Sequence, residues 1–451
     1  MTEATTTTPD WRSLRLVRRP LRSTLRPTDV ARALPPHQHA FALAGSWFDG
    51  GAVFGSAPTM VRSSETDHDP FELLDQLPDL SGDEPGVYGG WVGYLGYQTG
   101  NLIERLPGPP PRPSPLPTWW LAWHDHVVRF DLDTGWWFEA MVTDTSRPRM
   151  DDAFREWQAR LAGAAPPISH HALSSFVATP DGDDHRKAVR RALDHIMAGD
   201  IYQANVCLRL SATLEAGHPV DLFAAGIDRV DPRFGAYLDL GGRRAVVSLS
   251  PELFLRRRGL AVTTAPIKGT RPRMGSESHD LATAPKDRAE NVMIVDLMRN
   301  DLGRVCVPGS ISVPRLFDVE PHPGVWHLVS EVVGELRAEV ADGGLMRATM
   351  PPGSVTGAPK VRAMEVIAEV ETTGREVYTG AIGIVSPVAG ADWNVAIRTF
   401  EVADDDVWMG VGGGIVADSD PAAELAECIT KASPLIEALG ATLVPISRGR
   451  P

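Results

Sequence analysis

Lys268 has the surroundings that most clearly favour nucleophilic chemistry in this chain. It follows an apolar Pro-Ile pair and precedes a Gly-Thr pair, in a segment typical of a strand running into a turn. Exclusion of water from a lysine lowers its pKa and supplies the neutral amine that a nucleophile needs. Lysine side chains are mostly exposed, however, so a solvated turn lysine is the favoured interpretation of this segment when it is taken alone.

Three glutamates occupy predicted helices in positions suited to metal binding. Glu290 falls in an amphipathic helical pattern, and Glu424 and Glu427 are three residues apart after Asp420 and Pro421, a pair that predicts a helix start. A spacing of three puts both glutamates on one helix face, where a cation relieves their repulsion. Oxygen ligands suit Mg²⁺. An exposed acidic helix face is the alternative interpretation.

Two glycine-containing segments leave the backbone accessible. The loop 351–360 precedes a predicted helix, whose free N–H groups either bind an anion or are simply capped. The segment 410–416 places three consecutive glycines after a predicted strand, which permits close approach of another group, although the spacing is not that of a dinucleotide fingerprint. Arg398, in the strand-like stretch 394–401, has the fork geometry for a carboxylate. His327 taken alone indicates a buried core histidine.

The elements around these residues indicate an α+β fold. Strand patterns cover 245–255 and 380–386, and helical patterns cover 185–198, 288–298 and 360–370. Because strands and helices do not alternate as regular β-α-β units, a layered α+β sandwich is favoured over a doubly wound sheet.

The chain divides into two portions at a segment rich in small residues and proline. Residues 107–117 contain seven prolines and mark a first surface segment, after which residues 119–143 alternate like a strand pair. The second boundary, near 162–180, is the segment rich in small residues and proline. We therefore predict an N-terminal portion, 1–170, and a catalytic portion, 171–451, packed intimately as one fold unit.

Composition narrows the classes of partner. The 451 residues carry a formal net charge of −14, which argues against nucleic-acid and membrane-surface binding. No apolar run is long enough to span a membrane. Residues 1–10 lack an apolar signal core and predict a flexible tail. The scattered cysteines, Cys207, Cys306 and Cys428, predict buried apolar thiols in a reducing compartment, and hence a cytoplasmic protein.

Taken in order, these segments resemble the chorismate-utilising enzymes, most closely component I of aminodeoxychorismate synthase and nearly as closely component I of anthranilate synthase. The resemblance is dense over about 180–440 and looser before it, where Gly-Gly-Trp-Val-Gly-Tyr at 89–94 carries it. It implies two large β-sheets packed together with helices outside.

Two positions select the chemistry within that resemblance. Relatives that add water to chorismate carry a lysine base where this chain has Gln203, and relatives that use ammonia carry glutamine there. An amide is no general base near neutral pH, so Gln203 favours ammonia. Anthranilate synthases similar to this chain have alanine at the position of Lys268, whereas aminodeoxychorismate synthases have lysine.

The resemblance also implies roles for the remaining residues. Lys268 is the covalent nucleophile, Glu252 protonates the departing hydroxyl, and His327 assists beside the substrate. Glu290 and Glu427 bind Mg²⁺ with Glu424 in support. The implied substrate contacts, besides Gln203, are Gly269, Thr270, Tyr378, Arg398, Gly412, Gly413, Gly414 and Lys431.

The implied reaction is amination of chorismate at C4 to 4-amino-4-deoxychorismate, a precursor of p-aminobenzoate and folate. The alternative is anthranilate synthase component I, which aminates C2 and releases pyruvate. A separate glutamine amidotransferase is expected to supply ammonia, because no cysteine lies in a G-x-C-x-G motif. Pro352, Trp326 and 231–234 depart from the family pattern, and the last departure argues against feedback regulation by tryptophan.

Overall fold

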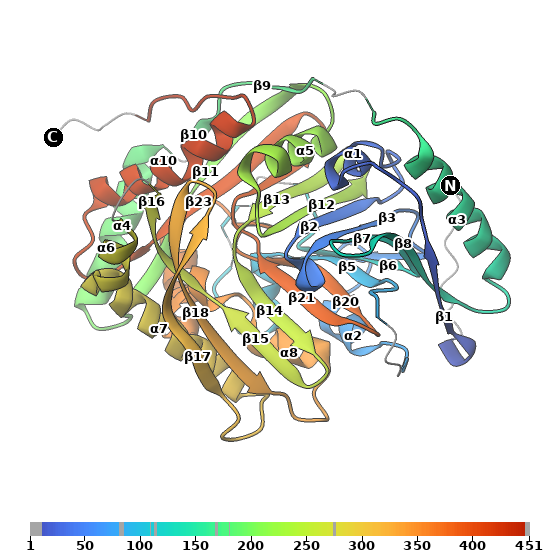
Figure 1. Ribbon diagram of the computed structural model, residues 1–451. Helices are drawn as coiled ribbons and strands as arrows, with labels where there is room; N and C mark the ends of the chain where they lie inside the picture. The colour runs from blue at the N-terminus through green and yellow to red at the C-terminus, as the bar shows by residue number, and fades with distance from the viewer. Residues whose placement is uncertain are drawn as a thin grey trace.

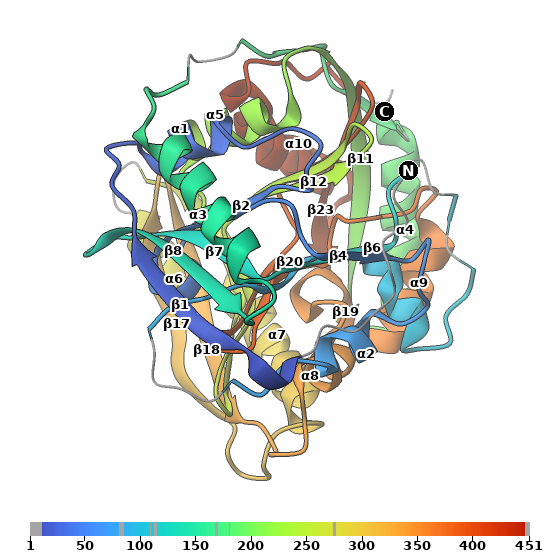
Figure 2. The same ribbon diagram turned by 90° about the vertical axis from the view of Figure 1, so that its right-hand side faces the viewer.

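The computed structural model describes residues 11–80, 85–108, 110–111, 115–166, 170–179, 181–273 and 277–446. The predicted flexible tail at 1–10 lies outside the described residues. Figures 1 and 2 show two layers of sheet with the helices gathered around their outer faces. Within the described residues, no helix is both long enough and apolar enough to cross a membrane.

The larger sheet has 13 strands. Their spatial order is β1 (Arg15–Pro20), β8 (Gly135–Val142), β7 (His126–Asp131), β3 (Gly51–Gly55), β2 (Phe41–Gly45), β12 (Phe234–Gly241), β13 (Arg244–Ser250), β22 (Thr399–Ala403), β23 (Asp406–Ile415), β11 (Gln203–Ala216) and β10 (Val177–Thr179). Two short strands, β19 (Gly357–Ala358) and β9 (Ala172–Leu173), also pair with β11.

The smaller sheet has 10 strands. Their order is β16 (Ile267–Pro272), β18 (Val325–Glu335), β15 (Ala261–Ala265), β14 (Leu253–Arg258), β21 (Gly390–Val395), β20 (Ala381–Ser386), β5 (Gly90–Leu95), β6 (Trp119–His124) and β4 (Met60–Ser63), with β17 (Ser312–His322) paired to β18. Neighbouring strands run antiparallel in both sheets.

The helices cover the sheets from outside. They are α1 (Pro27–Arg32), α2 (Pro70–Asp75), α3 (Arg147–Ala162), α4 (Gly182–Met197), α5 (Pro219–Val230), α6 (Glu277–Thr283), α7 (Pro285–Gly303), α8 (Asp342–Thr349), α9 (Lys360–Val370) and α10 (Pro421–Ala438). Helices α4, α5 and α10 pack on the larger sheet, and α6 and α7 pack on the smaller one. Asp420 caps α10 as predicted, accepting hydrogen bonds from the N–H groups of Ala422 and Ala423 at 3.0 and 2.9 Å.

An apolar layer joins the two sheets. One core cluster combines Leu43 and Val246 of the larger sheet with Tyr94, Trp120 and Ile382 of the smaller one. Burial of these faces against each other is the main apolar driving force for this architecture. The predicted fold, two large sheets packed together with helices outside, is confirmed.

Several predicted elements have different boundaries in the structure. The predicted strand 245–255 is two strands, β13 and β14, which belong to different sheets. The strand-like stretch 394–401 is likewise divided, because β21 ends at Val395 and β22 begins at Thr399. Residues 119–143 form three strands rather than two, and the glycines of 410–416 lie inside β23 rather than after a strand.

Each sheet contains strands from both sides of residue 170, and within a sheet the strands of each portion lie next to one another. The two portions are joined where β2 pairs with β12 in the larger sheet and where β5 pairs with β20 in the smaller one. Both sheets therefore continue across the boundary between the two predicted portions. The boundary at residue 170 stays a prediction about the organisation of the chain.

We expect Asp392→Ala to destabilise the fold by about 3 kcal/mol or more, because it leaves buried donors without their acceptor. The fully buried Asp392 carboxylate accepts hydrogen bonds from Arg256 Nε at 3.0 Å and from the Phe48 N–H at 2.8 Å, and it lies 2.9 Å from Arg258. Chemical denaturation measures the loss. Asp405→Ala, which breaks an exposed ion pair with Arg243, is the control and should cost no more than about 1 kcal/mol. Equal losses would contradict this account.

Candidate functional site

Glu252 and Arg398 lie where the chain passes from one sheet to the other. Glu252 lies between β13 and β14, and Arg398 precedes β22 with a left-handed φ of 52°. Backbone hydrogen bonds join the two segments that pass between the sheets, from Val395 N to Glu252 O at 3.0 Å and from Leu249 N to Arg398 O at 2.9 Å. Two residues that are 146 positions apart, 252 and 398, are thereby fixed at one place between the sheets.

The Glu252 carboxyl is held in its protonated form more readily than an exposed glutamate. Only 4% of the residue is exposed, and burial raises its pKa. A hydrogen bond from the Ser354 side chain and the positive charges of Lys268 and Arg398 oppose that rise. Burial also lowers the pKa of Arg398. A carboxyl whose pKa is raised by burial is suited to act as a general acid.

Lys268 lies at an irregularity of β16. The register of β16 against β18 shifts between Ile267 and Thr270, and such a bulge re-aims side chains away from the regular alternation. Gly269 completes the bulge with a φ of 79°, and a Cβ there would lie 2.7 Å from Leu281 Cδ1. Only glycine fits this position without strain.

Lys268 is partly exposed. Nζ donates a hydrogen bond to the backbone oxygen of Ser354 at 2.9 Å. Desolvation lowers the pKa of Lys268, while the negative charges of Glu290 and Glu252 oppose the shift. The solvated turn lysine is therefore not what the structure places here.

His327 faces the bulge from the neighbouring strand. It is opposite Thr270 in the β16–β18 register, and its Nδ1 lies 2.9 Å from Thr270 Oγ1. The His322 ring packs edge-on against it at 4.6 Å between centroids. Burial, assisted by the charge of Arg398, lowers the pKa of His327 to about 3. The imidazole is therefore neutral at physiological pH.

The predicted metal ligands lie on two helices on the more exposed side of the site. Glu427 and Glu424 of α10 approach the same backbone position of β23, since a Cβ on Gly413 would lie 4.0 Å from Glu427 Oε1 and 3.1 Å from Glu424 Oε2. Glu290 of α7 is close enough to Glu427 for that charge to contribute, after burial, to raising the Glu290 pKa. The three carboxylates therefore come from two helices, α7 and α10.

Lys431 completes this side of the site. It pairs with Glu427 at 2.8 Å and donates to the Gly412 oxygen at 3.1 Å. Ser419 Oγ donates to Glu424 at 2.6 Å, which fixes that carboxylate against β23.

The carboxylates suit a metal that keeps most of its ligands as water or substrate. Among the described residues, no three His, Cys, Asp or Glu side chains form a ready-made metal cage. Mg²⁺ is commonly bound by one or two carboxylates, with waters and substrate oxygens completing its octahedron. Glu290, Glu427 and Glu424 offer only carboxylate oxygens, so their donor chemistry fits this ion.

Gln203 packs against Gly414 of β23. Gln203 is 1% exposed, and its side-chain nitrogen occupies the space that a Cβ on Gly414 would need. Its Oε1 is buried without a hydrogen-bond partner among the described residues. A buried, unpaired acceptor is costly, and an incoming N–H donor removes that cost.

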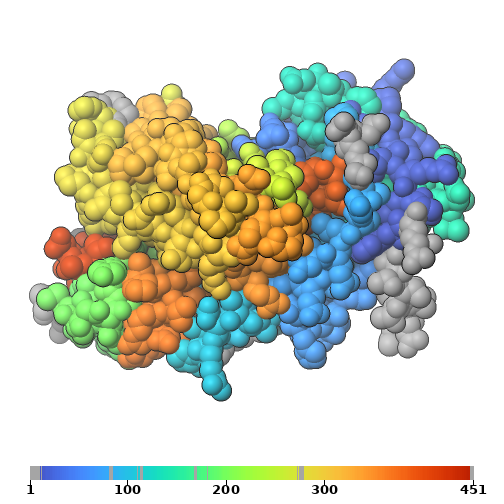
Figure 3. Space-filling model, turned by 90° about the horizontal axis from the view of Figure 1, so that it is seen from below, coloured from blue at the N-terminus to red at the C-terminus, as the bar shows by residue number. Residues whose placement is uncertain are grey.

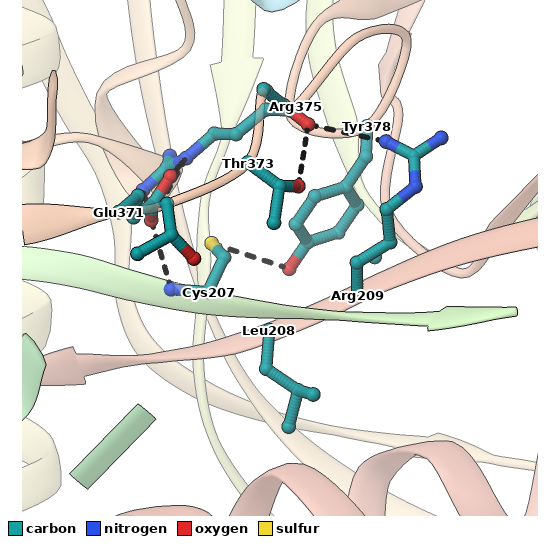
Figure 4. Close-up of a pocket in the computed structure, with 10 residues that line it drawn as sticks. Cys207, Leu208, Arg209, Glu371, Thr373, Arg375 and Tyr378 are labelled. Atoms are coloured by element: carbon teal, nitrogen blue, oxygen red, sulfur yellow. Dashed lines mark hydrogen bonds and ion pairs between the residues drawn. The ribbon is translucent and has the colours of Figure 1, made fainter. Parts of the chain in front are cut away.

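Tyr378 contacts strand β11 further along that strand than Gln203, another of the predicted substrate contacts. Its hydroxyl contacts Cys207 Sγ at 3.9 Å, and its ring fills the space beside Gly410. Figure 4 shows it in a small cavity with Arg209 and Arg375. Tyr378 therefore lines a small cavity with residues of β11, and its role as a substrate contact stays a prediction. Of the three unpaired cysteines, Cys306 and Cys428 are buried as predicted, whereas Cys207 is partly exposed.

One residue beside the reactive groups was missed by the sequence reasoning. Ser354 contacts both Lys268 and Glu252, from the loop for which only an anion-binding or capping role was considered. The loop does precede α9, but Pro359 is the N-cap residue and the helix begins at Lys360. Proximity of this loop to Lys268 depends on tertiary packing, which no local pattern encodes.

Figure 3 shows the yellow and orange segments that carry α7 and β18 forming one continuous surface with the blue N-terminal segments.

The chain matches the family of chorismate binding enzymes over residues 42–437. It is 39% identical to anthranilate synthase component 1 of Streptomyces coelicolor, over 91% of this chain and 86% of that protein. It is 35% identical to aminodeoxychorismate synthase component 1 of Escherichia coli, over 84% and 86% respectively. Relatives with both names therefore match at similar identity.

Solved structures agree on the fold. Anthranilate synthase component I of Streptococcus pneumoniae superposes with a TM-score of 0.73 at 27% identity, covering 89% of this chain and 92% of that one. The menaquinone-specific isochorismate synthase of Escherichia coli gives 0.73 at 19% identity, with 94% of both chains covered.

We expect the His327 ring to stay neutral between pH 8 and pH 5, because a group with a pKa near 3 binds no proton in that range. Nitrogen-15 NMR of labelled histidines measures this directly, and His327→Gln assigns the signal. Free histidine in the same buffer is the control and should titrate near its ordinary pKa of about 6.5. A His327 midpoint close to that of free histidine would show that the site is hydrated.

Proposed function

The chain belongs to the chorismate binding enzyme family, and on that premise we propose that it aminates chorismate at C4 to give 4-amino-4-deoxychorismate. The observation that carries this proposal is the desolvated amine of Lys268 beside the buried carboxyl of Glu252. These two pKa shifts favour the neutral amine and the protonated acid that a covalent displacement of a hydroxyl requires.

The first step forms a bond between Lys268 Nζ and ring carbon C2. The ring double bonds shift, the C4–O bond breaks, and Glu252 transfers its proton to the departing hydroxyl, which leaves as water. The lysine nitrogen then carries a positive charge, and the Glu252 carboxylate a negative one.

The second step reverses the shift of the double bonds. Ammonia forms a bond to C4, the C2–N bond breaks, and Lys268 leaves as the neutral amine. The new C4 ammonium returns one proton to Glu252, which restores the enzyme. Two displacements divide one difficult substitution into two easier ones and retain the configuration at C4.

Gln203 supports ammonia as the second reactant. Its buried Oε1 is without a partner among the described residues, and it accepts a hydrogen bond from an N–H donor. An amide does not deprotonate water near neutral pH, so this position favours an amine over a hydroxyl nucleophile. We propose that a separate glutamine amidotransferase supplies the ammonia.

Electrostatics complete the proposed site. Glu290 and Glu427 would hold Mg²⁺, with Glu424 in support, and the ion offsets the charge of the substrate's ring carboxylate next to these glutamates. Arg398 and the backbone of Gly412 to Gly414 would hold the enolpyruvyl carboxylate. His327 is neutral and would serve as a hydrogen-bonding partner there rather than as a cation. Gly269 and Thr270 would line the substrate beside Lys268.

Anthranilate formation is the second candidate function, and the relatives named anthranilate synthase favour it. The match to the Streptomyces coelicolor protein covers 91% of this chain. That reaction places nitrogen at C2 and releases pyruvate. It leaves no role for a desolvated lysine that attacks C2, which is why we favour amination at C4.

We expect Lys268→Ala to abolish formation of 4-amino-4-deoxychorismate or to redirect the product to anthranilate, because C2 is then free for ammonia. The purified chain is incubated with chorismate, Mg²⁺ and an ammonium salt, and the products are separated by liquid chromatography. Lys187→Ala, an exposed lysine paired with Asp184, is the control and should retain the wild-type product. If Lys268→Ala forms the wild-type product at the wild-type rate, the covalent step is excluded.

We expect Glu290→Gln to raise the Mg²⁺ concentration for half-maximal activity by about 10-fold or more, because one anionic ligand is lost. Initial rates are measured across a Mg²⁺ titration at saturating chorismate. The matched control is Asp296→Asn on the same helix, since this carboxylate is 62% exposed and pairs with Arg299. An unchanged Mg²⁺ requirement in Glu290→Gln would remove Glu290 from the proposed ligands.

A further inference from the structure

We propose that Ser354 is a positioning residue of this site, whose hydroxyl orients the Glu252 carboxyl while its backbone carbonyl fixes the Lys268 amine beside it. The inference rests on the proposed function, because it assigns Glu252 and Lys268 the roles of acid and nucleophile. It adds a third residue that touches both of them.

Ser354 contacts the two reactive groups through different atoms. Its backbone oxygen accepts a hydrogen bond from Lys268 Nζ at 2.9 Å. Its side chain is hydrogen-bonded to the Glu252 carboxyl, which also interacts with the backbone N–H of Ile267. Ser354 is itself 6% exposed, so water competes poorly for either bond. One residue therefore sets the relative positions of the amine and the acid.

The loop around Ser354 is anchored at its start by a lysine whose side chain is 13% exposed. Lys360, the first residue of α9, donates to the backbone oxygens of Thr349 at 2.8 Å and Pro351 at 3.0 Å. The same amine pairs with the buried Asp301 of α7. These bonds tie the start of the loop to two helices.

The end of the loop is held equally firmly. Buried Arg375 donates to the Val355 oxygen at 2.8 Å and is paired with Glu371 at 2.7 Å. Next to Ser354, Gly353 packs so closely on α7 that a Cβ would lie 2.8 Å from Leu297 Cδ2. A loop fixed at both ends and in its middle presents the Ser354 carbonyl and hydroxyl without an entropic cost at each turnover.

The hydroxyl also has a defined electrostatic effect on the acid. The groups that act on Glu252 are Lys268, Arg398, the Ile267 N–H and Ser354, and each of them favours the charged carboxylate. Removal of the hydroxyl takes away one donor and therefore raises the pKa of Glu252 further. The acid then keeps its proton to a higher pH.

The test is the dependence of kcat/KM on pH, measured as consumption of chorismate with ammonium and Mg²⁺. In Ser354→Ala the alkaline limb, where the acid loses its proton, should move to higher pH by about 0.5 to 1 unit, the size of one hydrogen bond to a carboxylate. Ser354→Thr keeps a hydroxyl and should restore the wild-type limb.

The matched control is Ser386→Ala, which removes a fully buried hydroxyl that donates to the Val87 oxygen, remote from this site. It should lower stability without moving the limb.

An unmoved limb in Ser354→Ala overturns the proposal, whatever the loss of rate. If that variant does not fold, Ser354→Cys keeps the volume with a weak donor, and the same shift or its absence decides. Chorismate consumption does not depend on which product forms, so a failure here is separate from a failure of the C4 assignment, which Lys268→Ala tests.

Discussion

Exclusion of water around the Lys268 amine is the constraint on which the rest of the site depends. The same desolvation that lowers the pKa of this lysine raises the pKa of Glu252, so both groups move toward the neutral forms that the proposed chemistry needs. Each partly offsets the shift of the other through its charge. The surrounding structure keeps this pair close together and oriented, and it does so with backbone geometry more than with additional charges.

The two-sheet architecture supplies that geometry where the chain passes from one sheet to the other and where a strand is irregular. Glu252 and Arg398 lie where the chain leaves one sheet for the other, and Lys268 lies at a bulge in an outer strand. Regular strands alternate their side chains between faces, whereas crossings and bulges direct them elsewhere. Gln203 and His327 are buried, whereas the side chains of Glu427 and Lys431 are about half exposed.

The sequence predicted the fold class, the cap of α10 and most of the elements, because periodicity and capping are local properties. It did not predict the breaks at Glu252 and Arg398, since an apolar run that crosses between two sheets has the same pattern as one long strand. Ser354 was missed for a related reason. Its importance arises from contact with residues about 90 to 100 positions away, and a Gly-Ser-Thr loop carries no local signal of that contact. The resemblance, rather than periodicity, supplied the roles of Glu252 and Gln203.

The central claim is that Lys268 reacts as a neutral amine with chorismate. The most direct measurement is rapid-quench peptide mapping by mass spectrometry, with the wild-type chain mixed with chorismate and Mg²⁺ in the absence of ammonia. The account predicts that the peptide containing Lys268 carries the mass of chorismate less one water, and that added ammonium removes this adduct. Chorismate turnover with ammonium at a full rate, with no adduct on that peptide at any quench time, would contradict it.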